Sequence, residues 1–212
     1  IPADISAVRR PWVETGNATA TNATNVTEAV TIFHTGQVLR GITTPGTTGT
    51  VGAELTGNNA LGAGNHVMTS ATNCTIGGGS SNDNKSTANG FIGGGLDNVV
   101  NGVGNPATNI NMGILAGNLN TITDALNAVI GGGISNGITN SPGSMVGGGN
   151  TNTINTASTD HFIGAGESNN ITASGHENVI VGGSNNEIIS GGSNAVIVGG
   201  HDNKANAIQG QV

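Results

Sequence analysis

Aliphatic residues return at regular intervals along most of the chain, and each is followed by a glycine-rich run that ends in asparagine. The repeating unit is an apolar residue, Gly or an apolar residue, Gly or Ala, Gly, two variable residues and Asn. The units begin at Ile76, Ile92, Ile114, Ile130, Val146, Ile163, Ile180 and Ile197, in steps of 16, 22, 16, 16, 17, 17 and 17 residues. A short fixed period predicts a stacked repeat architecture rather than an ordinary globular core.

Two further positions repeat within each unit. Eight residues after the start comes an aliphatic residue in most units, and six residues after it comes an asparagine in all of them. These asparagines are Asn82, Asn98, Asn120, Asn136, Asn152, Asn169, Asn186 and Asn203. A unit of 16 to 17 residues is too short for a strand and a helix, and it suits two short strands joined by two tight turns.

Stacking such units predicts a role for each repeated position. The two aliphatic positions face each other across a thin core, and rungs about 4.8 Å apart bring the asparagine side chains into a hydrogen-bonded column. We expect the glycines to adopt positive φ at the first turn and the asparagines to occupy left-handed positions near the second. The sequence therefore predicts an all-β fold, a parallel β-roll or β-solenoid with Gly- and Asn-rich rungs.

The residue just before each start is often bulky and apolar as well. Examples are Phe91, Val129, Met145, Phe162, Val179 and Val196. A strand that is apolar at consecutive positions is covered on both faces, so we expect a neighbouring subunit to cover the outer one. Composition points the same way, because 38 glycines and 2% aromatic residues leave a monomer little apolar surface to bury. The lone Cys74 cannot form an intrachain disulfide and is expected to be a small buried hydrophobe.

Two other interpretations of the repeat remain open at this point. Low-complexity chains rich in Gly, Asn and Thr are often disordered, although the aliphatic residues recur regularly over some 130 residues here. A left-handed hexapeptide β-helix of the acyltransferase kind needs three aliphatic corners in each rung. This sequence reliably offers two.

Outside the main repeat, two segments have a different character. Residues 1–50 are expected to form an N-terminal shoulder with a polar linker, in which residues 29–39 make a β-hairpin that turns near Thr35 and Gly36. Residues 51–75 are a transition or a degenerate repeat, with residues 61–65 as an earlier copy, and residues 76–212 are the β-roll domain.

One unit is about six residues longer than the others, and solenoids expel such insertions as loops. Insertions of this kind often lie on the binding face, although a tolerated bulge is an equal alternative. The candidate binding residues in this loop are Asn101, Val103, Asn105, Thr108 and Asn109.

The charged residues exclude some functions and identify no chemistry. Only five Lys and Arg accompany twelve acidic residues, so a nucleic-acid partner is not expected. No apolar run approaches the roughly 20 residues of a membrane span. His161, His176 and His201 each adjoin an acid, but they occupy different positions in their units, so we expect exposed turn histidines rather than a metal site. We expect no cofactor, no metal and no catalytic residues.

Residues 89–95, 127–133 and 194–200 have the sequences Asn-Gly-Phe-Ile-Gly-Gly-Gly, Asn-Ala-Val-Ile-Gly-Gly-Gly and Asn-Ala-Val-Ile-Val-Gly-Gly. These motifs resemble the head repeats of trimeric autotransporter adhesins and the repeats of phage tail-fibre tips. The resemblance covers about residues 60–205. It implies a left-handed parallel β-roll in an intertwined or side-by-side homotrimer, exposed on a bacterial cell surface or a virion fibre.

The function that this resemblance implies is attachment to a surface glycan or a receptor protein on a target cell. This repeat is longer than the usual head repeat, and the adjoining neck, coiled-coil stalk and anchor of an autotransporter are not seen in it. A glycan-cleaving tailspike, a hexapeptide-type acyltransferase and a purely structural fibre shaft are the alternatives. A tailspike needs a pair of carboxylates at a suitable spacing, and no such pair stands out in the sequence.

Overall fold

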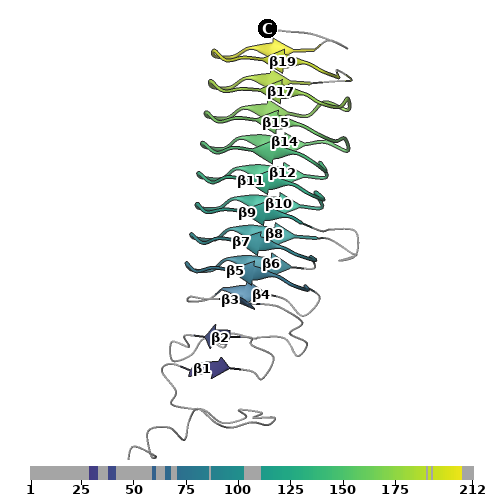
Figure 1. Ribbon diagram of the computed structural model, residues 1–212. Coiled ribbons are helices and arrows are strands. Elements are labelled where there is room, and N and C mark those ends of the chain that lie inside the picture. Colours follow the sequence, from purple (N-terminus) through teal and green to yellow (C-terminus); the bar gives the residue numbers. More distant parts are fainter. Residues whose placement is uncertain are drawn as a thin grey trace, which may run out of the picture.

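In the computed structural model, the described residues are 29–32, 38–41, 59–60, 65–67, 71–85, 87–102, 111–189, 191 and 193–206. They form strands and turns, with no helix among them. Most of them belong to one β-solenoid whose two sheets of nine parallel strands enclose the core (Figure 1). The predicted fold class, an all-β parallel β-solenoid with rungs of 16 to 17 residues, is therefore confirmed.

Each rung contributes one strand to each sheet. The odd sheet contains β3 (Asn59–Ala60), β5 (Thr75–Ile76), β7 (Phe91–Ile92), β9 (Gly113–Ile114), β11 (Val129–Ile130), β13 (Met145–Val146), β15 (Phe162–Ile163), β17 (Val179–Ile180) and β19 (Val196–Ile197). The even sheet contains β4 (His66–Val67), β6 (Asp83–Lys85), β8 (Val99–Asn101), β10 (Thr121–Thr123), β12 (Gly137–Thr139), β14 (Thr153–Asn155), β16 (Asn170–Ile171), β18 (Glu187–Ile188) and β20 (Lys204–Ala205).

Ahead of the solenoid lies the predicted hairpin. Strands β1 (Ala29–Ile32) and β2 (Val38–Gly41) pair antiparallel, with Ile32 opposite Val38. The expected turn near Thr35 and Gly36 and the linker at 42–58 lie outside the described residues. Stacking starts before Ile76, because β3 pairs with β5 and β4 pairs with β6.

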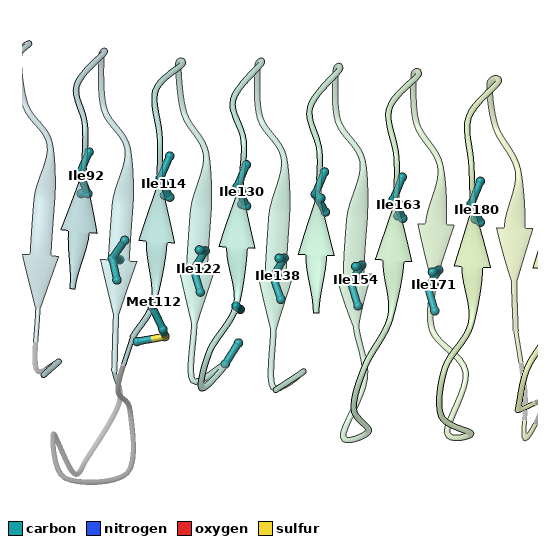
Figure 2. Packing of buried hydrophobic residues seen from close by; sticks show 14 of the residues in the cluster. Ile92, Met112, Ile114, Ile122, Ile130, Ile138, Ile154, Ile163, Ile171 and Ile180 are labelled. Atoms are coloured by element: carbon teal, nitrogen blue, oxygen red, sulfur yellow. The ribbon is translucent and has the colours of Figure 1, made fainter. Parts of the chain in front are cut away.

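Two columns of aliphatic side chains fill the core between the sheets. The first residue of every repeat unit, from Ile76 to Ile197, is completely buried on the odd sheet. The position eight residues later is buried on the even sheet and holds Ile in five successive rungs, from Ile122 to Ile188. Figure 2 shows these residues as two rows along the solenoid, one from each sheet. Burying two large aliphatic side chains contributes about 3–6 kcal/mol per rung before the entropy of ordering is subtracted.

Within each rung the two strands are joined by a short glycine turn, for example residues 131–136, and a longer wide turn leads to the next rung, for example residues 140–144. The glycine turns align along one edge of the solenoid and the wide turns along the other (Figure 1). The glycine turns hold the predicted asparagine ladder, which runs from Asn65 to Asn203. All of these asparagines between Asn82 and Asn186 are buried.

Asn136 shows how the ladder works. Its Nδ2 donates to Oδ1 of Asn120 in the preceding rung at 3.1 Å. The same group also donates to the carbonyl oxygens of Gly132 at 2.9 Å and Gly149 at 3.0 Å. Its Oδ1 accepts the backbone N–H of Asn152 in the next rung at 3.0 Å. Each amide therefore closes its own glycine turn and joins it to the turns on both sides.

The expectation that these asparagines occupy left-handed positions is wrong. Positive φ occurs instead at the third residue after each start, which is always glycine, and at the fifth, which is never glycine. Gly133 has a φ of 91°, and a Cβ there would collide with the carbonyl oxygen of Gly149 in the next rung. The ladder asparagines are therefore required for their amide groups. Glycine is required at the third position because φ is positive there and the backbone of the next rung leaves no room for a Cβ.

A second asparagine column lies on the outside of the wide turns. Asn73 donates to Asn89, Asn89 to Asn111 and Asn111 to Asn127 through their side-chain amides, at 3.4, 3.1 and 2.9 Å. All four have positive φ and exposed side chains. These left-handed asparagines lie three residues before the first four starts, from Ile76 to Ile130, a position for which the sequence analysis made no prediction.

Candidate functional site

The outer faces of the two sheets differ sharply in polarity. On the odd sheet, the residue before each start points away from the core, and the parallel register stacks these residues in one column. Phe91 and Met145 are 44% and 41% exposed, and Val129, Phe162, Val179 and Val196 are partly exposed. These are the residues for which the sequence predicted cover by a neighbour.

Apolar residues continue from this column onto the glycine turns. Six large apolar side chains in the turns are between 44% and 69% exposed: Leu96, Leu115, Leu119, Ile134, Val181 and Val198. Together with Phe91 and Met145 they are called the apolar strip below. Within the described residues, the exposed large apolar side chains therefore lie on the odd sheet and the glycine turns, and none lies on the even sheet or the wide turns. Exposed apolar side chains that gather on part of a surface are typical of an interaction site.

The outer face of the even sheet is polar by comparison. Its central strands, β10, β12, β14 and β16, present only Thr, Asn and Gly outward and hold no charged residue. Charged pairs lie toward its two ends, where Lys85 contacts Asp83 at 2.7 Å and Lys204 contacts Glu187 at 2.8 Å. Both pairs are substantially exposed and contribute little to stability. The centre of this face is a neutral surface of hydroxyl and amide groups.

The candidate loop is only partly within the described residues. Asn101 is the last residue of β8 and pairs with Lys85 and Thr123 in the even sheet. Val103, Asn105, Thr108 and Asn109 lie outside the described residues. A role of this loop in binding stays a prediction.

The three histidines occupy three different surroundings. His201 is exposed and its ring contacts Ser184 Oγ at 2.8 Å and Asp202 at 2.8 Å. His176 is exposed on a wide turn, where Nδ1 lies 3.0 Å from Ser158 Oγ. His161 is only 1% exposed, so the prediction of an exposed turn histidine is wrong for this residue. It is buried because it lies two residues before a start, a position that is buried throughout the solenoid.

The described residues offer no group of three or more His, Cys, Asp or Glu side chains that could hold a metal ion. Cys74 is buried, and desolvation raises the pKa of its thiol. Gly90 donates its backbone N–H to Cys74 Sγ at 3.3 Å, and Thr87 Oγ1 lies 3.2 Å from the sulfur. The thiol therefore sits within a hydrogen-bonded core position rather than at a surface site.

Sequence reasoning missed the polar cluster beneath the wide turns, which contains Ser144, Thr156, Ser158, His161 and Asn178. All five side chains are buried, and hydrogen bonds that involve side chains or backbone N–H groups link the five residues. A signal was present, since the residue two before each start changes from Met112 and Ala128 to polar residues in these rungs.

No protein-family model and no curated protein sequence matches this chain. The fold therefore supplies the classification: this is an all-β repeat protein with a parallel β-solenoid architecture. In the part of the chain that the structure describes, no helix is long and apolar enough to cross a membrane.

Proposed function

We propose that this chain is the repeat domain of a homotrimeric adhesive fibre and that the apolar strip is the contact between its subunits. The observation that carries the proposal is that the exposed large apolar side chains of the described residues lie on the odd sheet and the glycine turns and not on the even sheet or the wide turns. Residues of the strip occur in six of the eight repeat units, from Phe91 to Val198. A second and third copy can cover it by packing side by side along the same axis.

The size of the strip is consistent with association. Complete burial of a large apolar side chain contributes about 1.5–3 kcal/mol. The eight residues of the strip are about half exposed, so covering them contributes roughly 6–12 kcal/mol per subunit. Association costs about 4–15 kcal/mol in lost freedom. Burial of the strip alone therefore roughly balances that cost. Burial of the partly exposed column, from Val129 to Val196, would supply the net favourable free energy of association.

Packing through the strip would leave the even sheet and the wide turns facing outward. These surfaces carry Thr and Asn side chains and few charges, which suits hydrogen bonding to a neutral surface glycan or to a receptor protein. We therefore propose attachment, and not catalysis, as the activity, with no metal or cofactor. The protein would act outside the cell, on a bacterial surface or a virion fibre. The left-handed coil that the sequence resemblance implies belongs to the same proposal.

Light scattering coupled to size-exclusion chromatography tests the subunit contact. We expect three chains per particle for the wild type and dissociation for Leu115→Lys combined with Val198→Lys, because lysine cannot be buried unpaired at the contact. Thr121→Lys, on the outer face of β10, is the matched control and should remain trimeric. A monomeric wild type at micromolar concentration would refute the trimer.

Adhesion is tested separately with the trimeric protein on a glycan array and on intact bacterial and eukaryotic cells. Saturable binding that falls when central even-sheet threonines such as Thr121, Thr139 and Thr153 are replaced would support recognition by that face. A trimer that binds no glycan and no cell would indicate a structural shaft. Shortening of a glycan during incubation would indicate a tailspike enzyme instead.

A further inference from the structure

The wide turns enclose a column of side chains that changes character along the solenoid. This column lies two residues before each start, and its members are buried. Met112 and Ala128 occupy it in the central rungs, whereas Ser144, His161 and Asn178 occupy it in the three rungs that follow. Each of these three polar side chains is at most 1% exposed.

In these rungs each polar side chain accepts a backbone N–H from the next rung. His161 N–H donates to Ser144 Oγ at 3.0 Å, and Asn178 N–H donates to His161 Nδ1 at 3.2 Å. Ala195 N–H then donates to Asn178 Oδ1 at 3.0 Å. The imidazole of His161 therefore joins two rungs at the wide-turn edge, as the asparagine ladder does at the glycine edge.

These contacts assign the proton on the imidazole. Nδ1 accepts a backbone N–H, so it carries no proton in the closed structure and the ring proton is on Nε2. Nε2 lies 3.3 Å from Thr156 Oγ1, which also accepts the N–H of Ser158 at 3.0 Å. A second proton on Nδ1 would point at the N–H of Asn178. Protonation would therefore break the bond between the rungs and place a positive charge in the core.

The surroundings of His161 offer little compensation for that charge. Asp160 precedes it on the same turn, His176 comes from the following wide turn, and the neighbouring Glu177 is exposed and accepts a hydrogen bond from Asn194. At the Nε2 side the ring contacts the hydroxyl group of Thr156, which is hydrogen-bonded to Ser141 and Ser158, and Ser141 contacts Ser144. Desolvation, assisted by His176 and opposed by Asp160, lowers the pKa of His161 from 6.5 to about 4.

We propose that His161 is an acid-sensitive latch, whose protonation opens the wide turns at residues 156–161 and 172–178 while the glycine edge stays closed. The glycine edge of the same rungs is held by Asn152, Asn169 and Asn186, whose amides do not titrate. The latch does not depend on the adhesive function proposed above. In an exposed fibre it would loosen one defined segment on acidification, without unstacking the whole solenoid.

Proton uptake determines the direction in which pH shifts the opening of the wide turns. The opened turn has the ordinary histidine pKa of 6.5 and the closed turn a pKa of about 4, so the open form binds more protons between these values. The closed form is therefore fully favoured above pH 6.5 and loses its advantage as the pH falls toward 4. With these two values, the equilibrium constant for opening rises about twenty-fold between pH 7 and pH 5.

Amide hydrogen exchange of the full wild-type chain at pH 7 and pH 5 measures this opening. After correction for the intrinsic exchange rate, protection of the Asn178 amide should fall about twenty-fold, because its acceptor is His161 Nδ1. The Asn136 amide, bound to Asn120 in the glycine edge, is the internal reference and should keep its protection. Equal behaviour of the two amides would overturn the latch.

His161→Asn is the matched variant, because Asn178 already shows that an Asn in this column accepts the N–H of the next rung. This variant should keep Asn178 protected at pH 5, whereas His176→Gln should still lose protection. Loss of protection in His161→Asn equal to that of the wild type would reject the assignment to His161. If that variant does not fold, NMR titration of the His161 ring in the wild type tests whether the folded protein lowers its pKa. A ring that titrates near pH 6.5 in the folded protein contradicts the proposal.

Discussion

Removing one amide from the asparagine ladder tests directly what holds the rungs together. Asn136 is 1% exposed and occupies the middle of the ladder. Its Nδ2 reaches Asn120, Gly132 and Gly149, and its Oδ1 accepts the N–H of Asn152. Asn136→Ala leaves the backbone unchanged and removes all of these side-chain contacts together.

The expected loss of stability follows from those contacts. The amide has two protons to donate, and each hydrogen bond contributes about 0.5–1.5 kcal/mol net. The substitution also leaves the buried N–H of Asn152 without its acceptor, which costs about 1–3 kcal/mol. The free energy of unfolding should therefore fall by roughly 2–6 kcal/mol, a large part of the 5–15 kcal/mol that is typical of folded proteins.

Urea unfolding followed by far-UV circular dichroism measures the change, at one fixed protein concentration because association contributes to stability. Asn155→Ala is the control, since this exposed asparagine at the end of β14 should change stability by less than about 0.5 kcal/mol. Asn136→Asp has the same size but no proton to donate at neutral pH, so it should destabilise at least as much as alanine. If Asn136→Ala and Asn155→Ala unfold at the same urea concentration, the ladder does not stabilise the fold as we argue.

Two further substitutions test the core and the glycine turns. Ile130→Asp should prevent folding, because it buries an unpaired charge between the sheets. Thr121→Asp, on the outer face of the even sheet, should fold normally. Soluble yield and circular dichroism distinguish the two variants. Gly133→Ala should lower the melting temperature by several degrees, because it combines positive φ with a collision against the Gly149 carbonyl. Gly148→Ala should leave the melting temperature unchanged, because a Cβ has room there. Equal melting temperatures of the two variants would contradict the close packing of the glycine turns.

The wide turns show where prediction from sequence stopped. The sequence placed His161 two residues before Ile163 and next to Asp160, which suggested an exposed turn. In the structure the position two residues before each start is buried, so His161 is buried, while His176, four residues before its start, is exposed. Other units hold apolar residues such as Met112 at this position, and the change to polar residues in these rungs hid its burial from an analysis of the apolar pattern.

The repeating pattern by itself determined the solenoid, the two aliphatic columns and the asparagine ladder. It could do so because each rung contacts only its neighbours, so residues one period apart must stack on one another. Only the tertiary structure decided which turn positions take positive φ, how the wide turns bury a histidine, and which apolar side chains of the glycine turns are exposed. These features depend on the direction in which each turn leaves the sheets, and the backbone path fixes that direction.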